Sequence, residues 1–433
     1  MASRVAAIVL VVSALLPVRA QNKAASAGDR IFQTTKLHRI HVAIPPAEWA
    51  VLQTSTPRGA AAVGRPAGAD YTDANGRLIH VGGGFGGYFP WARADARFDD
   101  GETKTEFKNI GIRYKGNLSF SSSSAAAPLF ANFKIKLDVH GTRGTWDGEK
   151  TFNLHAGVVD TSKMRDAIAY TIFRAAGVPA PRTAYVELTV SVPGVYQDAA
   201  AGLFTMIEDV NKTFVERTLP PGTGLLMKPE GMRGGVQNLG PTWASFLQTY
   251  RPDREATPRE QQRVMEFAHL VNQPDVALFR ERIGTYLDVD RFLRFVAVNA
   301  MIANRDSFLG GSHNFYIYLD PKDGLVRFIP WDQDLSMGSR PGGRAGNLTE
   351  FDVMRPFSGD QPLIYWLLDD PARAAQYRAI VKELGTSVFT EPELLKLVDA
   401  LEKVGTGRGP SPREFITSRT AYVRQLVASL AGK

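Results

Sequence analysis

The chain has 433 residues, of which 44% are hydrophobic and 22% charged, and it contains no cysteine. This composition excludes an intrinsically disordered chain and suffices for two compact domains or one large two-lobed domain. The lack of cysteine excludes disulfides, metal thiolates and a thiol nucleophile, and the net charge of +7 comes from basic residues scattered among acidic ones, which argues against nucleic-acid binding.

Residues 1–20 have the pattern of a secretory signal peptide. Arg4 precedes an apolar run over 5–16, and Val18 and Ala20 occupy the two positions that a signal peptidase recognises. The run is shorter than the roughly 20 apolar residues that span a membrane, and no later stretch of the sequence reaches that length. We therefore expect cleavage near Ala20, export to the periplasm, cell surface or medium, and no transmembrane segment.

After a short linker over 21–30, residues 31–230 are expected to form a sheet-rich lobe. It begins with a strand over 37–44 and a helix start at 45–49. Residues 54–104 are rich in Gly, Ala, Asp and Pro and predict a loop or insertion. Further strands are predicted over 110–114, 132–139, 182–192 and 201–208, with one helix over 162–176 that ends at Gly177.

Residues 231–433 are expected to form a helix-rich lobe. Helical periodicity covers 256–283, 288–303, 361–385 and 391–428, and a strand pair over 314–319 and 326–331 interrupts it. A sheet-rich lobe followed by a helix-rich lobe with an internal hairpin is the plan of a kinase. The fold class we predict is therefore α+β, a two-lobed atypical protein-kinase-like fold.

Three polar residues mark the end of one predicted helix and the two ends of this hairpin: Asp306, Asn314 and Asp332. Phosphoryl transfer needs a carboxylate to orient the acceptor hydroxyl and hard oxygen ligands for Mg²⁺. Asp and Asn are also common in turns and caps, but their combination beside Trp331 favours a functional site. Asp306 and Asn314 are eight residues apart where kinases have five, so the loop between them must differ.

The order of these blocks resembles the CotH kinase family, named after spore coat protein H. The resemblance implies that Asp306 is the catalytic carboxylate, Asn314 a metal or phosphate contact, Asp332 a metal ligand and Asp334 an auxiliary ligand. It runs from about Ile31 to the C-terminus. The matching blocks are 112–119, 164–166, 202–208, 286–292, 304–316 and 330–334.

Candidate phosphate-binding lysines lie on one predicted strand. Lys134 and Lys136 alternate with apolar residues and project from one face. The family usually has another lysine just before this block, where this chain has Phe130 and Ala131. Which lysine pairs the phosphates is therefore open, and a solvated strand face is the alternative for each.

Other nucleotide contacts are expected around the sheet-rich lobe. Lys115, Asn117 and Ser119 lie in a loop whose amides suit phosphate binding, although a Ser-rich turn explains them equally well. Glu208 ends a strand where two kinase lobes would join. The glycine pattern over 82–87 is a lone match, which we assign to loop structure.

The predicted helix over 162–176 carries Arg165 and Asp166 opposite its apolar face. Either could pair with the strand lysine as a kinase helix carboxylate does, although an ordinary amphipathic helix accounts for them too. His313 neighbours Asn314 and is either a site residue or a simple hairpin residue.

The resemblance implies an exported kinase that uses ATP with Mg²⁺ or Mn²⁺ to phosphorylate a protein hydroxyl. Its partner would be an exported protein, for which a Ser- or Thr-rich chain is one option. One alternative is a catalytically inactive kinase fold that serves as a surface or coat attachment module. Another is a nucleotide-dependent transferase acting on a sugar or lipid, because a fold and a metal site do not identify the acceptor.

Overall fold

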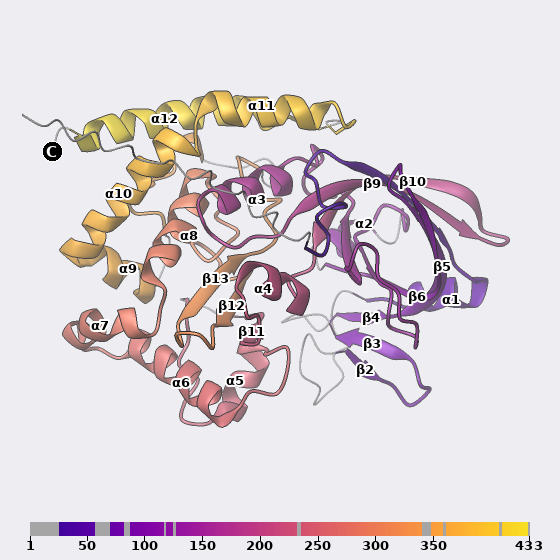
Figure 1. Ribbon diagram of the computed structural model, residues 1–433, viewed down its shortest axis with the longest axis horizontal. Coiled ribbons are helices and arrows are strands. Elements are labelled where there is room, and N and C mark those ends of the chain that lie inside the picture. The colour runs from indigo at the N-terminus through magenta and orange to yellow at the C-terminus, as the bar shows by residue number, and fades with distance from the viewer. Residues whose placement is uncertain are drawn as a thin grey trace, which may run out of the picture.

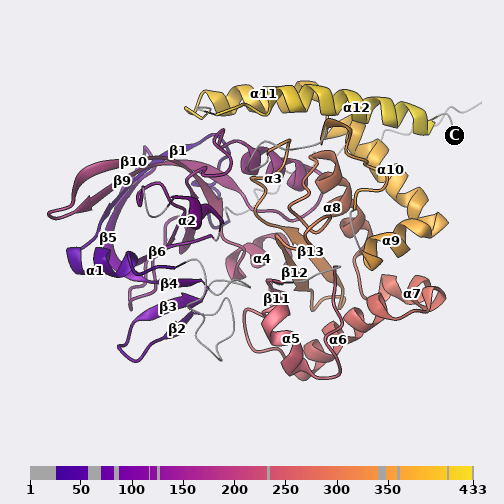
Figure 2. The same cartoon turned by 180° about the vertical axis from the view of Figure 1, so that it is seen from behind.

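Most of the chain is described by the computed structural model, which covers residues 26–56, 70–81, 87–116, 118–123, 127–231, 235–339, 348–357, 361–406 and 409–431. The expected signal peptide, residues 82–86 of the glycine pattern and Asn117 lie outside these residues. Figure 1 and Figure 2 show a strand-rich half beside a helix-rich half. The fold is thus mixed α+β, as the sequence predicts.

The strand-rich half is a closed barrel in the order β1-β5-β6-β7-β8-β10-β9. β1 pairs parallel with β9, and the other neighbours pair antiparallel. Inward and outward side chains alternate, so β7 buries Phe133 and Ile135 inside and places Lys134 and Lys136 on the outer face. The strands are β1 (Leu37–Ala43), β5 (Ala92–Asp99), β6 (Lys104–Tyr114), β7 (Phe133–Lys136), β8 (Thr151–His155), β9 (Thr183–Val192) and β10 (Tyr196–Glu208).

The region expected to be an insertion, 54–104, instead contains much regular structure. β5 is a full barrel strand that turns Ala94, Ala96 and Phe98 inward. Alanine and aspartate are poor strand formers, which hid this strand in the sequence. Around it lie a small antiparallel sheet of β2 (Asp70–Thr72), β3 (Leu78–Val81) and β4 (Tyr88–Pro90), and the helices α1 (Pro46–Leu52) and α2 (Leu118–Ser123).

The helix-rich half surrounds a three-stranded sheet in the order β11-β12-β13. The predicted hairpin is confirmed, since Phe315 pairs with Pro330 at its open end and Leu319 with Val326 near its turn. The strands are β11 (Leu225–Met227), β12 (Phe315–Leu319) and β13 (Val326–Pro330), and the helices are α3 (Arg165–Ala175), α4 (Lys212–Thr218), α5 (Trp243–Tyr250), α6 (Pro258–Asn272), α7 (Val276–Arg282), α8 (Val289–Met301), α9 (Pro362–Asp369), α10 (Pro371–Ser387), α11 (Glu391–Glu402) and α12 (Arg413–Ala431), with short 3₁₀ turns at Ile283–Thr285 and Leu348–Glu350.

Two hydrophobic cores divide the described residues differently from the predicted boundary at 230. One core fills the barrel, and the other joins the helices to the β11-β12-β13 sheet. Helix α3, which comes from the first half of the sequence, belongs to the second core and contacts α8 and α11, as Figure 1 shows. The barrel and the helical half therefore meet along α3, so side chains of α3 can contact both halves.

Within the described residues, no helix combines the length and the apolar character needed to cross a membrane.

Candidate functional site

Asp306 lies in the loop after α8, where it contacts the residue that precedes β12. The N-cap of α8 is Asp288, whose side chain accepts a hydrogen bond from the Arg291 backbone amide. Asp306 Oδ2 accepts a hydrogen bond from Asn314 Nδ2 at 2.9 Å, and the Asp306 carbonyl accepts one from the same nitrogen at 2.7 Å. The eight-residue spacing therefore still brings the two predicted residues into contact.

His313 completes this loop. Its Nε2 lies 2.8 Å from Asp306 Oδ1, and this hydrogen bond raises the pKa of His313 to about 9. At neutral pH the imidazole is therefore a cation that holds one oxygen of Asp306, while Asn314 holds the other. The Asp306 side chain keeps 36% of its surface exposed, so its carboxylate is accessible from solvent.

A buried amide connects this loop to the segment after β13. Gln333 is fully buried, and its Oε1 accepts a hydrogen bond from Asn304 Nδ2 at 2.8 Å, while its Nε2 donates to the Trp331 carbonyl at 2.7 Å. Asn304 Oδ1 in turn accepts from the Asp306 amide at 3.0 Å. The Asp306 loop and the Asp332 segment are thus fixed to each other by side chains that the sequence did not single out.

Asp332 and Asp334 flank Gln333. Asp332 has a φ of 54°, in the left-handed region, and its amide donates a hydrogen bond to the Tyr170 hydroxyl of α3 at 2.9 Å. Burial raises the pKa of both carboxyls, and the charges of Asp166 and Asp306 raise them further. These carboxylates repel one another, so a bound cation would lower their energy.

Lys115 reaches the same place from the end of β6. Its Nζ lies 2.7 Å from His155 Nε2 and 5.1 Å from the ring centroid of Trp331. Burial lowers the pKa of Lys115 to about 7, against the opposing charge of Asp332. Of the three candidate lysines, Lys115 is thus the one that lies next to the predicted metal ligand.

Lys134 and Lys136 have different surroundings. Lys134 Nζ donates to Asp209 Oδ1 at 2.7 Å, and Asn153 donates to the same oxygen at 2.9 Å. The positive charge of Lys134 lowers the pKa of Lys115, which places the two lysines within electrostatic reach. Lys136 lies farther along β7, opposite Thr151 of β8.

Lys228, just after β11, is a cation at this site that we did not predict. Its Nζ lies 5.8 Å from the ring centroid of Tyr316 and 6.0 Å from that of Trp331. The charge of Lys228 lowers the pKa of both Lys115 and Lys134. Lys115 and Lys228 therefore both lie beside Trp331, with Lys134 within electrostatic reach of both, as expected for a site that attracts phosphate.

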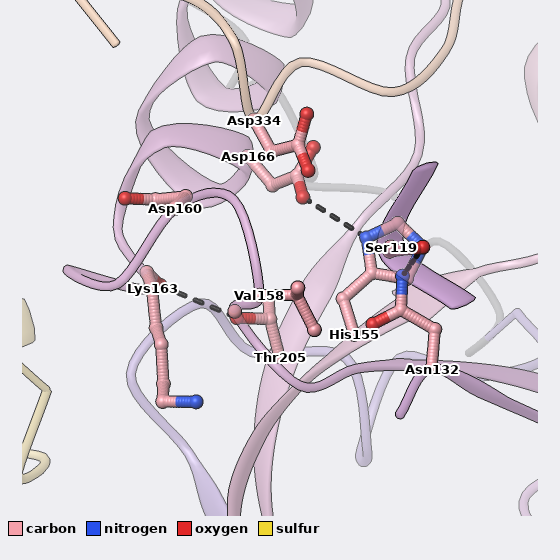
Figure 3. Close-up of a pocket in the computed structure, with 10 residues that line it drawn as sticks. Ser119, Asn132, His155, Val158, Asp160, Lys163, Asp166, Thr205 and Asp334 are labelled. Carbon is pink, nitrogen blue, oxygen red and sulfur yellow. Dashed lines mark hydrogen bonds and ion pairs between the residues drawn. The ribbon is translucent and has the colours of Figure 1, made fainter. Parts of the chain in front are cut away.

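Ser119 lines a small pocket beside the carboxylates (Figure 3). Asp334, Asp166 and His155 also contribute to its wall. Asn132 Nδ2 donates to Ser119 Oγ at 3.1 Å. Ser119 and Asp334, predicted from distant parts of the sequence, thus share one pocket.

Glu208 has a different environment from the other predicted residues. It is fully buried, and its carboxylate bonds to Arg182 at 2.7 Å and to Arg217 at 2.6 Å. Arg182 also contacts Glu149, whose pKa is raised to about 7 by burial and by the charge of Glu208. These contacts account for the Glu208 side chain without a ligand, and a nucleotide contact by this residue remains a prediction.

We expect Glu208→Ala to destabilise the protein by about 3–5 kcal/mol, because it removes the buried carboxylate that pairs with Arg217 and leaves Arg182 with the carboxylates of Glu149 and Asp29. Chemical denaturation measures this change. Glu187→Ala is the matched control, since Glu187 forms an exposed pair with Arg39 and should change stability by less than about 1 kcal/mol. A Glu208 variant as stable as the parent protein would contradict the prediction.

The donor set at the site fits Mg²⁺ or Mn²⁺ held together with phosphate. Among the described residues, no group of three or more His, Asp or Glu side chains could hold a metal ion by itself. Mg²⁺ commonly binds one or two carboxylates plus substrate phosphates. Asp332, Asn314 and Asp334 offer carboxylate and amide oxygens of this kind, and burial together with neighbouring carboxylates raises the pKa of both carboxyls.

The structure groups most of the predicted residues and separates others. Asp306 contacts Asn314 directly, and the Asn304–Gln333 contact fixes this pair to the segment of Asp332 and Asp334. Lys115 lies within this group, Lys134 and Ser119 lie beside it, Lys136 and Glu208 lie outside it, and Asn117 falls outside the described residues. The residues that sequence reasoning missed are Gln333, His155, Asp209, Tyr170 and Lys228.

The two predicted residues of helix α3, Arg165 and Asp166, have different partners in the structure. Arg165 pairs with Asp160 in the segment before α3 and also donates a hydrogen bond to Ser162 Oγ. Asp166 Oδ2 lies 3.2 Å from His155 Nδ1 and thus reaches Lys115 through an intervening histidine.

Comparison with known proteins gives one family match and two curated relatives. The family model described as CotH kinase protein matches residues 112–405. An inner spore coat protein H from Bacillus subtilis is 23% identical over 265 residues, which cover 59% of this chain and 69% of that protein. Invasin CotH7 from Rhizopus delemar is 25% identical over 252 residues, 56% of this chain and 40% of that protein, so the match spans less than half of the invasin.

Two solved structures are similar over 69% of this chain. One is a complex of Shewanella oneidensis HipA with HipB and operator DNA, at 11% identity, a TM-score of 0.28 and 57% coverage of that chain. The other is the Helicobacter pylori proinflammatory kinase CtkA, at 10% identity, a TM-score of 0.29 and 95% coverage. These likenesses are weak, and the sequence match is the stronger finding.

Proposed function

The chain belongs to the CotH kinase protein family, and we propose that it transfers the γ-phosphate of ATP to a protein hydroxyl with the help of Mg²⁺ or Mn²⁺. The observation that carries the proposal is the convergence of Asp306, Asn314 and Asp332 at the open end of the β12–β13 hairpin. A purely structural module has no physical need to hold carboxylates together at one place. We further propose that the barrel and the helical half act as the two lobes of a kinase-like fold.

In the proposed reaction, Asp306 accepts a hydrogen bond from the acceptor hydroxyl and takes its proton as the new oxygen–phosphorus bond forms and the bond to ADP breaks. His313 and Asn314 fix the two oxygens of Asp306. Lys115 and Lys228 attract the phosphate oxygens. A bound divalent cation would neutralise phosphate charge beside Asp332.

The direct test incubates the mature protein with γ-labelled ATP and either Mg²⁺ or Mn²⁺, with a general protein acceptor present. We expect label on the protein itself or on the acceptor, and none when EDTA is added. No transfer, together with no ATP-dependent rise in melting temperature, would contradict the proposal.

We also propose that the chain acts outside the cytoplasm. The apolar run over 5–16 and the residues before Ala20 support export. The names of the two relatives, a spore coat protein and an invasin, support the same location.

A second candidate function is an inactive module that attaches to a coat or surface. It is favoured by Phe130 and Ala131, which stand where the family usually has a lysine. The two functions differ in the labelling experiment, because an attachment module would transfer no phosphate.

ATP binding is expected to weaken as the pH rises above about 7. Lys115 attracts phosphate when protonated, and burial lowers the pKa of Lys115 to about 7, so the free protein loses this charge above that pH. The apparent Kd should rise by up to about tenfold per pH unit until it reaches the pKa of the bound state. Isothermal titration calorimetry from pH 6 to 9 measures this profile.

Lys115→Arg is the control for the pH profile. Its guanidinium stays charged over the whole range, so its Kd should lack the rise that begins near pH 7. Identical profiles for the parent protein and the variant would show that Lys115 is not the titrating group.

A further inference from the structure

A continuous line of polar contacts connects the barrel to the segment after β13. Lys115 Nζ lies 2.7 Å from His155 Nε2, and His155 Nδ1 lies 3.2 Å from Asp166 Oδ2. The other oxygen of this carboxylate, Asp166 Oδ1, accepts a hydrogen bond from the Gln333 backbone amide at 2.9 Å. The contacts join four parts of the fold: the end of β6, the end of β8, α3 and the loop that holds Asp332. His155 and Asp166 face each other at the wall of the pocket in Figure 3.

We infer that His155 is a positioning residue, which holds the Lys115 ammonium toward the phosphates and ties it to the segment of Asp332 through Asp166. The inference rests on the proposed function, since it concerns how the same site binds the phosphates of ATP. It adds a role for a histidine that neither the sequence motifs nor the family match points to.

The hydrogen-bond directions fix the state of the imidazole. A protonated Lys115 can only donate, so His155 Nε2 must accept, and Nδ1 must carry the hydrogen that is donated to Asp166. Burial and the charge of Lys115 lower the pKa of His155 to about 3, which agrees with a neutral ring. A neutral imidazole orients the lysine without cancelling its charge, whereas a carboxylate in direct contact would cancel part of it.

The alternative is that His155 only fills space in the core beside Trp331. Its side chain is 7% exposed, and its ring packs edge-on against Trp331 at 6.4 Å between centroids. A packing role predicts that substitutions weaken every ligand of the site equally. A positioning role predicts a loss confined to ligands that carry phosphate.

Two substitutions separate the two hydrogen bonds of the ring. His155→Asn keeps a donor near Asp166 but is too short to reach Lys115. His155→Gln is long enough to offer Lys115 an acceptor oxygen. We expect His155→Asn to weaken Mg·ATP binding by about tenfold or more without changing the affinity for adenosine, and His155→Gln to restore most of the ATP affinity.

The experiment measures Kd for Mg·ATP and for adenosine by calorimetry in the parent protein and both variants, with melting temperature as the check on folding. The same substitutions in a Lys115→Ala background form a double-mutant cycle. There His155→Asn should cause no further loss of ATP affinity, because the lysine it positions is gone.

The outcomes are distinct. Equal losses for ATP and adenosine, or a full loss from His155→Asn in the Lys115→Ala background, would overturn the positioning role while leaving the proposed function intact. A parent protein that binds no Mg·ATP would overturn both.

Discussion

Asp306→Asn is expected to lower phosphoryl transfer by about 10²–10⁴-fold, the range for loss of a positioned general base. The amide is nearly isosteric with the carboxylate, so the loop should keep its shape. It cannot take the proton of the acceptor hydroxyl, and one of its two polar atoms becomes a donor facing either His313 or Asn314. Label transfer from γ-labelled ATP measures the loss.

Nucleotide affinity gives the first control for this variant. Asp306 contacts the acceptor hydroxyl and not ATP in the proposed reaction, so the Kd for Mg·ATP should change by less than about threefold. His313→Gln is the second control. It removes the cation beside Asp306 but keeps the carboxylate, and should therefore lower transfer far less. An Asp306→Asn variant with near-parental transfer would exclude Asp306 as the base.

Local sequence pattern was enough to predict the elements that carry the site. The β12–β13 hairpin has an apolar run before an Asp- and Gly-containing turn and a largely apolar strand, interrupted by Arg327, after it, and α8 repeats buried residues at helical spacing after its cap Asp288. Asp306, Asn314 and Asp332 sit at the ends of these elements. Once the elements were placed, the proximity of these residues followed from the hairpin geometry.

The contacts that hold the site together could not be predicted from local sequence pattern. Gln333 and Asp166 are 167 positions apart, and local pattern cannot show a contact over that separation. β8, which carries His155, is only five residues long and has two apolar residues, Phe152 and Leu154. That alternation is a weak signal, and neither the strand nor its histidine was predicted. The mistaken insertion over 54–104 has a related cause, because β5 fills its inward positions with small alanines and not with β-branched residues.

Asp334→Asn is expected to stabilise the metal-free protein while weakening its response to Mg²⁺. Burial raises the pKa of Asp334 well above its ordinary value, and the charges of Asp332, Asp166, Asp160 and Asp306 raise it further. Keeping this carboxylate ionised at pH 7 therefore costs free energy in the folded state. A neutral amide of the same size removes that cost, so the free energy of unfolding of the metal-free protein should rise.

The pH dependence gives the same prediction an independent check. A carboxyl whose folded pKa is raised stabilises the folded state below its unfolded pKa, and this contribution is lost as the pH rises through the folded value. The metal-free parent protein should thus gain stability on acidification from pH 8 toward the unfolded pKa of aspartate, near 4, and Asp334→Asn should lose part of this gain. Urea unfolding at several pH values, with EDTA, measures both.

Mg²⁺ together with a nucleotide should stabilise the parent protein, as acidification does, because a cation also neutralises the crowded carboxylates. The rise in melting temperature that Mg·ATP produces should therefore be smaller in Asp334→Asn than in the parent. Asp369→Asn is the matched control, since that carboxylate is 54% exposed and pairs with Arg280 away from the site. If Asp334→Asn destabilised the metal-free protein, the predicted cost of its charge would be wrong, and a response to Mg·ATP equal to that of the parent protein would exclude Asp334 as an auxiliary metal ligand.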